Sequence, residues 1–263
     1  MTPTNSEKIS VLIITLNEEE NLKKLLPTLD FADEIIIVDS YSTDQTETIS
    51  NSFSRVTFLQ NKFENFSRQR NFALLQAKND WVLFLDADEI LTSGLQHEII
   101  ETLENDTNCS AYFIKRVFLF ENKILKYSGN QTDKIFRLFN KNHAKYDENR
   151  LVHEKLIVNG KIGLLKNKLI HYSYTSFQEY KNKIIIYGKF KAQEKFAKKI
   201  KPTFIVQLAH PIYNFLYNYI IRLGILDGKK GVIICYLNAY SIFVRYRELK
   251  RLWIENKLLI SKT

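Results

Sequence analysis

The chain has few of the residues that punctuate or cross-link proteins. Only 4 prolines, 8 glycines and 2 cysteines occur in 263 residues, of which 45% are hydrophobic. This composition excludes a disordered or collagen-like chain and predicts one large globular domain, or one domain with an appended module. Cys109 and Cys235 lie far apart in the sequence, so we expect reduced thiols in a cytoplasmic protein.

Long hydrophobic runs are also missing. The apolar run at 11–16 is shorter than that of a signal peptide and follows no basic segment, so we expect a protein that is not exported. No run reaches the roughly 18 apolar residues of a membrane-spanning helix. The longest candidates, near 203–221 and 231–244, are interrupted by polar side chains.

Glycine motifs for nucleotide binding are absent. No G-x-G-x-x-G follows the first apolar run and no G-x-x-x-x-G-K-[ST] occurs, which excludes the NAD fingerprint and the P-loop. We also find no nucleic-acid-binding motif, so nucleic acid is not an expected partner. A bound phosphate group would have to be neutralised in another way.

Apolar runs and helical patterns alternate over the first hundred residues. The runs cover 8–16, 33–40, 55–59 and 80–88, and patterns such as 17–29 and 64–78 have helical spacing. This alternation predicts an α/β fold with a doubly wound, mostly parallel sheet and helices on both faces.

The pattern changes twice further along the chain. From about residue 110, shorter alternating runs predict a mixed or antiparallel extension of the sheet. After Thr175 the sequence predicts helices at about 176–200, 203–222 and 231–257. Residues 176–263 carry 17 Lys and Arg against 5 Asp and Glu, whereas residues 1–175 carry 21 against 24. The second part is therefore a basic helical region that we expect to meet an anionic partner.

Polar side chains follow three of the apolar runs. They are Thr15, Asn17 and Glu18, then Asp39, Ser40 and Ser42, and finally Asp86, Asp88 and Glu89. The carboxyl ends of parallel strands form the ligand-binding edge of such sheets, so we favour one shared site over separate helix caps. Two aspartates one residue apart suit a hard divalent cation, Mg²⁺ or Mn²⁺, that shares its coordination with a substrate phosphate. For Asp39 or Asp44 alone, helix capping explains the side chain equally well.

Four segments, in this order and spacing, carry a resemblance to a known family. The segments "VLIITLNEEENL", "EIIIVDSYSTDQT", "FSRQRNFAL" and "WVLFLDADE" resemble the nucleotide-sugar half of family-2 glycosyltransferases with the GT-A fold. Three later segments, "LVHEKL", "LIHYSY" and "LGILDGKKG", resemble the bacterial branch of lipopolysaccharide-core β-1,4-glucosyltransferases. The resemblance implies a catalytic domain at 1–175, with a nucleotide-sugar half at 1–108 and an acceptor half at 109–175, followed by the helical region at 176–263.

The resemblance also implies roles for individual residues. The nucleotide of a UDP-sugar would be bound by a set of seven side chains: Thr15, Asn17, Glu18, Asp39, Ser42, Arg70 and Asp86. Within this set, Asp39 would accept a hydrogen bond from uracil and Arg70 would approach the diphosphate or Asp86. Asp88 would bind the metal directly and Asp86 would contact the ribose or the metal. Ser42 matches the same signature, and Arg68 fits a basic position or a solvated face.

An inverting member of this family needs a carboxylate base for the acceptor hydroxyl. The matching residue is Glu154. Strand alternation turns Glu154 and the neighbouring His153 to opposite faces, so we expect only one of them to face the site. We favour Glu154 because the chemistry of the family that the sequence resembles uses an acid at this position. His171 resembles a histidine that some GT-A enzymes add to the metal, although a structural role is also open. Glu89 fits either a contact to the metal or sugar, or a cap of the helix that starts near Thr92.

The basic region interleaves aromatic and aliphatic residues with lysine and arginine. One explanation is a pair of helices that pack their apolar side on the catalytic domain. We favour peripheral contact with an anionic inner-membrane surface from the cytoplasmic side.

Together these features predict an inverting transferase. It would move a hexose, with glucose favoured, from a UDP-sugar to a lipopolysaccharide-core, glycolipid or oligosaccharide acceptor. A sugar nucleotidyltransferase is the first rival, but it would need a glycine-rich basic loop where "TLNEEENL" stands. A non-catalytic, membrane-associated binder of sugar nucleotides is the second rival.

Overall fold

The structure is a computed structural model that describes residues 7–105, 108–121, 123–129, 133–148, 155–174 and 176–260. The chain divides into two compact units. We call Met1–Val117 with Asp133–His171 the sheet unit, and Phe118–Thr132 with Tyr172–Thr263 the helical unit. The domain boundary predicted at residue 175 stays a prediction.

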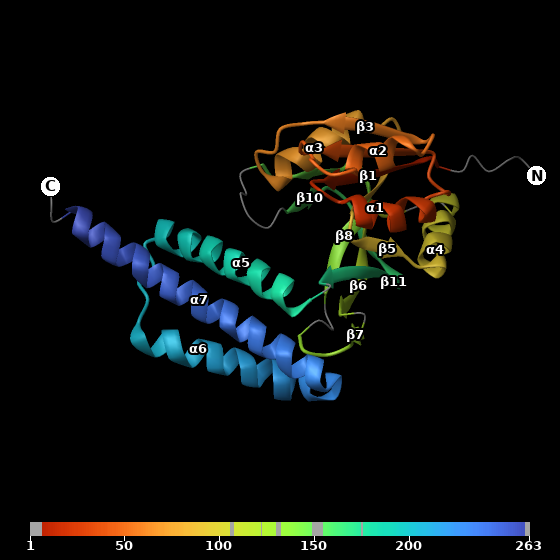
Figure 1. Cartoon of the computed structure of the whole chain (residues 1–263). Coiled ribbons are helices and arrows are strands. Elements are labelled where there is room, and N and C mark those ends of the chain that lie inside the picture. The colour runs from red at the N-terminus through yellow and green to blue at the C-terminus, as the bar shows by residue number, and fades with distance from the viewer. Residues whose placement is uncertain are drawn as a thin grey trace, which may run out of the picture. The chain divides into compact units, whose positions relative to one another are not determined.

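The first half of the sheet unit is the predicted parallel sheet (Figure 1). Its strands are β1 (Ile9–Thr15), β2 (Glu34–Asp39), β3 (Val56–Gln60) and β4 (Trp81–Asp86). They run parallel in the order β3-β2-β1-β4. Because helices cover both faces, β1, β2 and β4 are buried along nearly their whole length, which is why their sequences read as continuous apolar runs.

The helices of the sheet unit are α1 (Glu19–Leu25), the 3₁₀ turn η1 (Leu26–Thr28), α2 (Thr46–Asn51), α3 (Phe66–Gln76) and α4 (Ser93–Glu104). Leucines of α1, together with Leu95, Ile99 and Leu103 of α4, join the core on one face of the sheet. Ala73 and Leu74 of α3 join the core on the other face. Side chains cap two of these helices, since Asn65 accepts from the Arg68 amide and Thr92 accepts from the Leu95 amide. The parallel part of the sheet therefore lies between two helical layers.

The second half of the sheet is antiparallel, as the sequence predicts. The order continues β4-β8-β6-β11-β5, and β9 pairs with β10 in a separate ribbon. The bounds are β5 (Glu89–Leu91), β6 (Ala111–Phe120), β8 (Lys134–Asn140), β9 (Ala144–Tyr146), β10 (Leu156–Val158) and β11 (Ile162–Tyr174). Strands β5 and β9 were not predicted, because three residues are too few to show an alternating pattern.

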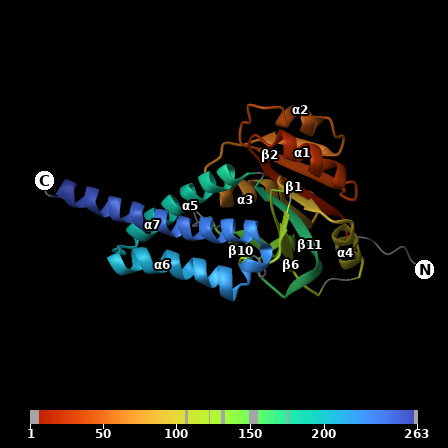
Figure 2. The same ribbon diagram turned by 60° about the horizontal axis from the view of Figure 1, so that its bottom comes forward.

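The helical unit contains the three predicted helices. They are α5 (Phe177–Ala197), α6 (Phe204–Leu216) and α7 (Lys229–Ile260), and α7 runs between the other two (Figures 1 and 2). Tyr180 and Ile184 of α5 pack on Ile234 and Leu237 of α7. At Gly188 the two helices come so close that a β-carbon would lie 3.0 Å from the Ser241 carbonyl oxygen.

Two short elements link α6 to α7. A π-helical turn, η3 (Tyr217–Ile221), ends α6, and the 3₁₀ turn η4 (Gly224–Asp227) precedes α7. The buried carboxylate of Asp227 accepts from the amides of Lys126 and Tyr127, both at 3.0 Å, and from the Ser128 hydroxyl at 2.8 Å. Asp227 thus fastens the segment that follows β7 (Lys123–Leu125), which gives the predicted motif "LGILDGKKG" a structural role. In the part of the chain that the structure describes, no helix has the length and apolar character needed to cross a bilayer.

Candidate active site

The site lies at the carboxyl ends of the parallel strands. Register pairs Thr15 of β1 with Asp39 of β2, and Ile14 of β1 with Asp86 of β4. Three polar segments that are far apart in the sequence therefore meet at one edge of the sheet, where ligands bind in open α/β folds.

The ends of β1 and β2 form one hydrogen-bonded group. The fully buried Asp39 accepts from the Thr15 hydroxyl at 2.9 Å, and from the amide and hydroxyl of Ser42 at 2.7 and 2.5 Å. Asn17 donates its amide to the Ser42 hydroxyl at 2.7 Å and accepts from the Thr43 amide at 2.8 Å. These bonds hold the two loops at a fixed spacing, which makes a preformed wall beside the strand ends.

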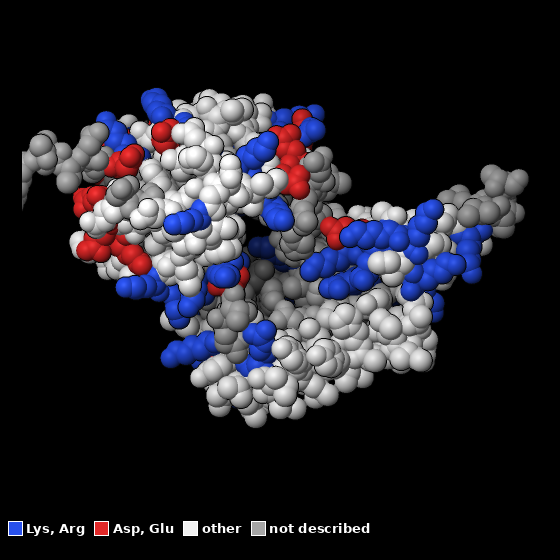
Figure 3. Space-filling model, turned by 180° about the vertical axis from the view of Figure 1, so that it is seen from behind, with Lys and Arg blue, Asp and Glu red and all other residues white. Residues whose placement is uncertain are grey.

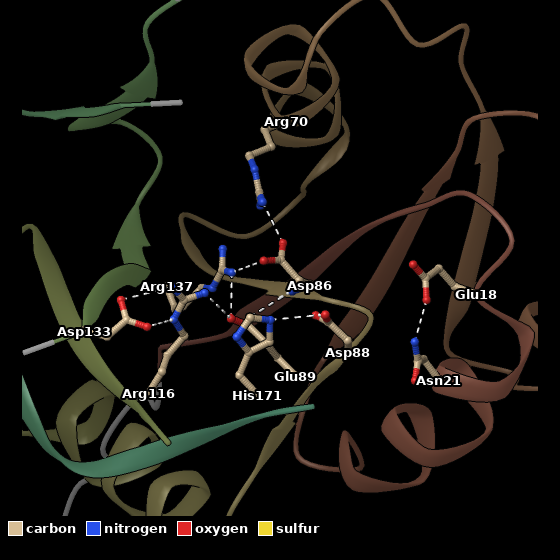
Figure 4. Close-up of polar contacts among 10 residues, drawn as sticks. All are labelled: Glu18, Asn21, Arg70, Asp86, Asp88, Glu89, Arg116, Asp133, Arg137 and His171. Atoms are coloured by element: carbon tan, nitrogen blue, oxygen red, sulfur yellow. Dashed lines mark hydrogen bonds and ion pairs between the residues drawn. The ribbon is translucent and has the colours of Figure 1, made fainter. Parts of the chain in front are cut away.

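Glu18 and Asp44 lie where α1 and α2 begin. Asp44 accepts from the amides of Glu19 and Thr46 at 3.2 and 3.0 Å, so it is a cap, one of its two predicted roles. Glu18 accepts from the Asn21 side chain at 2.7 Å, and Figure 4 shows this pair apart from the carboxylates that follow β4.

Two arginines hold the carboxylate of Asp86 (Figure 4). Arg70 donates to Oδ1 at 2.6 Å and Arg137 donates to Oδ2. The Arg70 guanidinium also stacks over the Phe84 ring, 4.5 Å from its centroid. Burial alone would raise the pKa of Asp86, but the charges of Arg137 and Arg70 outweigh it and hold the pKa well below its usual value. Asp86 is therefore an anion at every physiological pH.

Glu89 belongs to the same buried network. Its Oε2 accepts from the Asp86 amide at 3.0 Å and its Oε1 accepts from Arg137 at 2.8 Å. Burial would lower the pKa of Arg137, but Asp86 and Glu89 raise it above its usual value. Glu89 does not cap α4, because Thr92 does so. Its side chain is fully buried and holds both the Asp86 backbone and the Arg137 guanidinium in place through these two hydrogen bonds.

A second arginine–carboxylate pair adjoins Glu89. Arg116 of β6 donates to both oxygens of Asp133, from Nε at 2.9 Å and from Nη2 at 3.1 Å, and lies 3.5 Å from Glu89. Sequence reasoning missed Arg116, Asp133 and Arg137. One signal was available, because an arginine inside the apolar run "KIFRLFN" needs a buried carboxylate, and three follow β4.

Asp88 points away from the arginines toward His171. Register pairs His171 of β11 with Glu89 of β5, and this brings its Nε2 within 3.2 Å of Asp88 Oδ2. Both side chains keep some solvent exposure, 22% for Asp88 and 16% for His171. Within the described residues no three His, Cys, Asp or Glu side chains form a complete metal site. One carboxylate and one imidazole fit Mn²⁺, or Mg²⁺ with more water, when substrate oxygens complete the shell.

The remaining predicted residues separate into two groups. Arg68 forms an exposed ion pair with Glu64, so it lies on the solvated face. Glu154 and His153 lie outside the described residues, and the choice between them stays a prediction.

Comparisons with known proteins identify the family. Residues 10–160 match the family described as "Glycosyl transferase family 2". The chain is 30% identical to an uncharacterized glycosyltransferase of Rickettsia typhi, over 97% of this chain and 91% of the relative. It is 26% identical to the lipopolysaccharide core biosynthesis glycosyltransferase LpsC of Rhizobium meliloti, over 90% of this chain and 93% of LpsC.

A solved structure supports the fold. The S. aureus protein TarS, residues 1–349 in complex with UDP, aligns with a TM-score of 0.51 and 17% identity over 95% of this chain and 92% of TarS. The predicted fold class is confirmed, with a GT-A sheet followed by the helical region α5–α7. By its family match and its full-length relatives, the chain belongs to glycosyl transferase family 2 and is a transferase enzyme.

Proposed function

We propose that this enzyme moves a hexose from a UDP-sugar to a lipopolysaccharide-core or other surface-glycan acceptor, with inversion at the anomeric carbon. Glucose is the favoured hexose. The observation that carries the proposal is the Asp88–His171 pair beside an Asp86 whose two oxygens are held by arginines. The likeness to LpsC, described as a lipopolysaccharide core glycosyltransferase, supports the acceptor class.

The ends of β1 and β2 are the proposed nucleotide site. Thr15, Asn17, Asp39 and Ser42 are joined by hydrogen bonds, so a nucleotide would meet loops that are already ordered, at little entropic cost. Glu18 flanks this wall from the start of α1. UDP is the proposed nucleotide because the sequence resemblance implies it, and TarS, which shares the fold, was solved with UDP.

Asp88 and His171 are the proposed protein ligands of a divalent cation. When bound, Mg²⁺ or Mn²⁺ would neutralise the negative charge that develops on the departing UDP. Asp86 stays a predicted ligand as well, but each of its oxygens already accepts from an arginine. Each oxygen keeps a second lone pair, but the charge of the carboxylate is shared with two guanidinium groups, which makes Asp86 a weaker metal ligand than Asp88. We therefore propose that Asp86 mainly orients Arg70 toward the diphosphate.

Glu154 is the proposed base. It would accept the proton of the acceptor hydroxyl as the hydroxyl oxygen attacks the anomeric carbon. The bond between that carbon and the UDP oxygen breaks in the same step, and the electron pair leaves with UDP. The partner surface of the proposal is the cytoplasmic face of an anionic inner membrane, where a lipid-linked acceptor is available.

The test measures both binding and turnover. Asp88→Asn should abolish Mn²⁺-dependent UDP binding in calorimetry and release of UDP from UDP-glucose. The matched control is Asp80→Asn, the same change at the residue that precedes the first residue of β4. This variant should behave as wild type. If Asp88→Asn binds UDP as tightly as wild type and still needs Mn²⁺ to do so, Asp88 is not a ligand of the metal. UDP binding without turnover in wild type would favour a non-catalytic binder. Release of pyrophosphate from a separate mixture of UTP and glucose 1-phosphate would favour a nucleotidyltransferase.

A further inference from the structure

Helix α6 has its apolar side facing outward. None of its residues is buried, and Phe204 and Ile205 are 74% and 75% exposed. The other strongly exposed apolar side chains of α6 and η3 are Val206, Leu208, Ile212, Tyr213, Leu216, Ile220 and Ile221. Soluble proteins rarely expose a continuous apolar surface of this kind, and when they do it usually marks a contact site.

The polar residues of the same stretch lie on its less exposed side. Gln207, His210, Asn214 and Asn218 follow one another at helical spacing, and all four are only partly exposed. His210 hydrogen-bonds to the hydroxyl of Tyr246 on α7 at 3.0 Å. A surface helix in water has the opposite arrangement. The outer side of α6 is therefore suited to an apolar surrounding.

Charge is absent from this stretch and concentrated around it. Residues 203–221 contain no Asp, Glu, Lys or Arg. Lysines at 198, 199 and 201 precede it, and Arg222, Lys229 and Lys230 follow it. Figure 3 shows the helical unit with blue side chains gathered over α5 and α7 and a white surface over α6. An apolar strip with basic residues at both ends matches the acyl and headgroup layers of an anionic bilayer.

From these observations we propose that α6 and η3 form an in-plane membrane anchor that inserts into the interface of an anionic phospholipid bilayer. The 13 residues of α6 and 5 of η3 extend about 27 Å at helical rise. Their polar side chains are turned toward the protein and Pro211 lies within α6, so the stretch is suited to lie in the interface rather than to span the bilayer. A second copy of the chain is a poorer occupant, because it would bring two strongly basic units together.

A groove between α6 and α7 extends the apolar surface. It has a volume of about 320 Å³. Its lining includes Pro211, Ile212, Phe215 and Leu216 of α6 with Tyr236 and Tyr240 of α7. We assign this groove to one acyl chain of the same bilayer. The inference deepens the proposed function by naming how the enzyme meets a lipid-linked acceptor, but membrane binding is measured without transfer.

The main experiment is flotation of the full chain with phosphatidylcholine vesicles containing phosphatidylglycerol. The double variant Ile205→Glu/Ile212→Glu should partition about 100-fold less than wild type, since each buried isoleucine contributes about a factor of ten. The control, Leu75→Glu/Ile162→Glu, adds the same charge at exposed apolar positions of the sheet unit and should float as wild type does. Equal flotation of wild type and both double variants overturns the proposal. Circular dichroism checks that the variants are folded.

Depth is measured with a fluorescent probe. Tyr213→Trp, at a position 63% exposed in α6, should be quenched more by lipids brominated near the headgroup than by lipids brominated near the chain ends. Tyr41→Trp in the sheet unit is the control and should be quenched no more than wild type, in which Trp81 and Trp253 give the background signal. Stronger quenching by the deep label would overturn in-plane insertion.

Two further outcomes separate the explanations. Light scattering would assign the surface to a second copy if wild type is a dimer and Ile205→Glu/Ile212→Glu is a monomer. If wild type also fails to float with vesicles, that result overturns the proposal. Absence of metal-dependent UDP release from wild type without vesicles would count against the proposed function, while normal flotation would still support the anchor.

Discussion

The two units of the chain place charged and apolar side chains in opposite ways. In the sheet unit, Arg137 and Glu89 are almost completely buried and bonded to each other. In the helical unit, Phe204 and Ile205 are about three-quarters exposed, at 74% and 75%. The buried charges have partners within the chain, whereas none of the described residues covers the outer side of α6. A buried charge or an exposed apolar surface is therefore interpreted by what it contacts. A contact within the chain indicates a role in stability, and the lack of one indicates a binding surface.

The largest expected effect separates chemistry from binding in the sheet unit. Glu154→Gln should lower transfer by about 10²- to 10⁴-fold, as for loss of a general base, and leave UDP affinity unchanged because the amide keeps the size of the side chain. Steady-state transfer and UDP calorimetry provide the measurements. His153→Gln is the companion variant, and the proton acceptor would be reassigned if it, rather than Glu154→Gln, abolished turnover.

The next effect tests whether the buried charges hold the sheet unit together. Arg137→Met leaves Asp86 and Glu89 with one cation fewer and should lower the free energy of unfolding by about 3–5 kcal/mol. Arg68→Met removes an exposed ion pair with Glu64 and should cost about 0–1 kcal/mol. Urea unfolding of both variants measures the contrast. Similar values for the two would mean that the buried network contributes no more than a surface pair.

A smaller effect is expected within the helical unit. Leu237→Ala empties a fully buried site of the α5–α7 core and should cost about 2–5 kcal/mol. Ile205→Ala should change the free energy of unfolding by no more than about 0.5 kcal/mol, because its side chain is exposed. Both values come from urea unfolding without lipid. A large loss in Ile205→Ala would indicate that the outer side of α6 is covered in solution.

The smallest effect is a pH dependence. The pKa of Asp86 is depressed in the folded chain, so its contribution to stability is complete above its unfolded pKa and is lost as pH falls toward the folded value. The difference in unfolding free energy between wild type and Asp86→Asn should stay constant from pH 7 to 5 and shrink only below about pH 4. Urea midpoints across this range test the sign. A difference that already shrinks at pH 6 would contradict it.

Part of the active site could be read from the sequence. The strands β1, β2 and β4 are buried on both faces, so they leave continuous apolar runs, and the polar residues that follow them must meet at one edge of the sheet. That reasoning located Asp39, Asp86 and Asp88 without coordinates. The family resemblance added His171, which the structure brings within 3.2 Å of Asp88.

Other parts of the site depend on strand register. Arg137 reaches Asp86 because β8 runs antiparallel to β4, and Arg116 reaches Asp133 across the β6–β8 pair. Antiparallel register over separations of this length leaves no local pattern, since it is set by how whole strands pack. The strand β5, which carries Glu89 into the core, was missed for a different reason, because its three residues are too few to show an alternating pattern.

The sequence by itself determined the α/β order, the helices of the second part, the basic charge of that part and the family. Each follows from local patterns of apolar spacing, composition or motif. Only the tertiary structure decided that Asp86 is bonded to two arginines while Asp88 faces His171, and that α6 turns its apolar side outward. These depend on contacts between segments far apart in the chain. Such contacts form only where packing brings the segments together. In the low-dielectric interior an unpaired charge is costly, so each buried charged side chain must lie beside one of opposite sign.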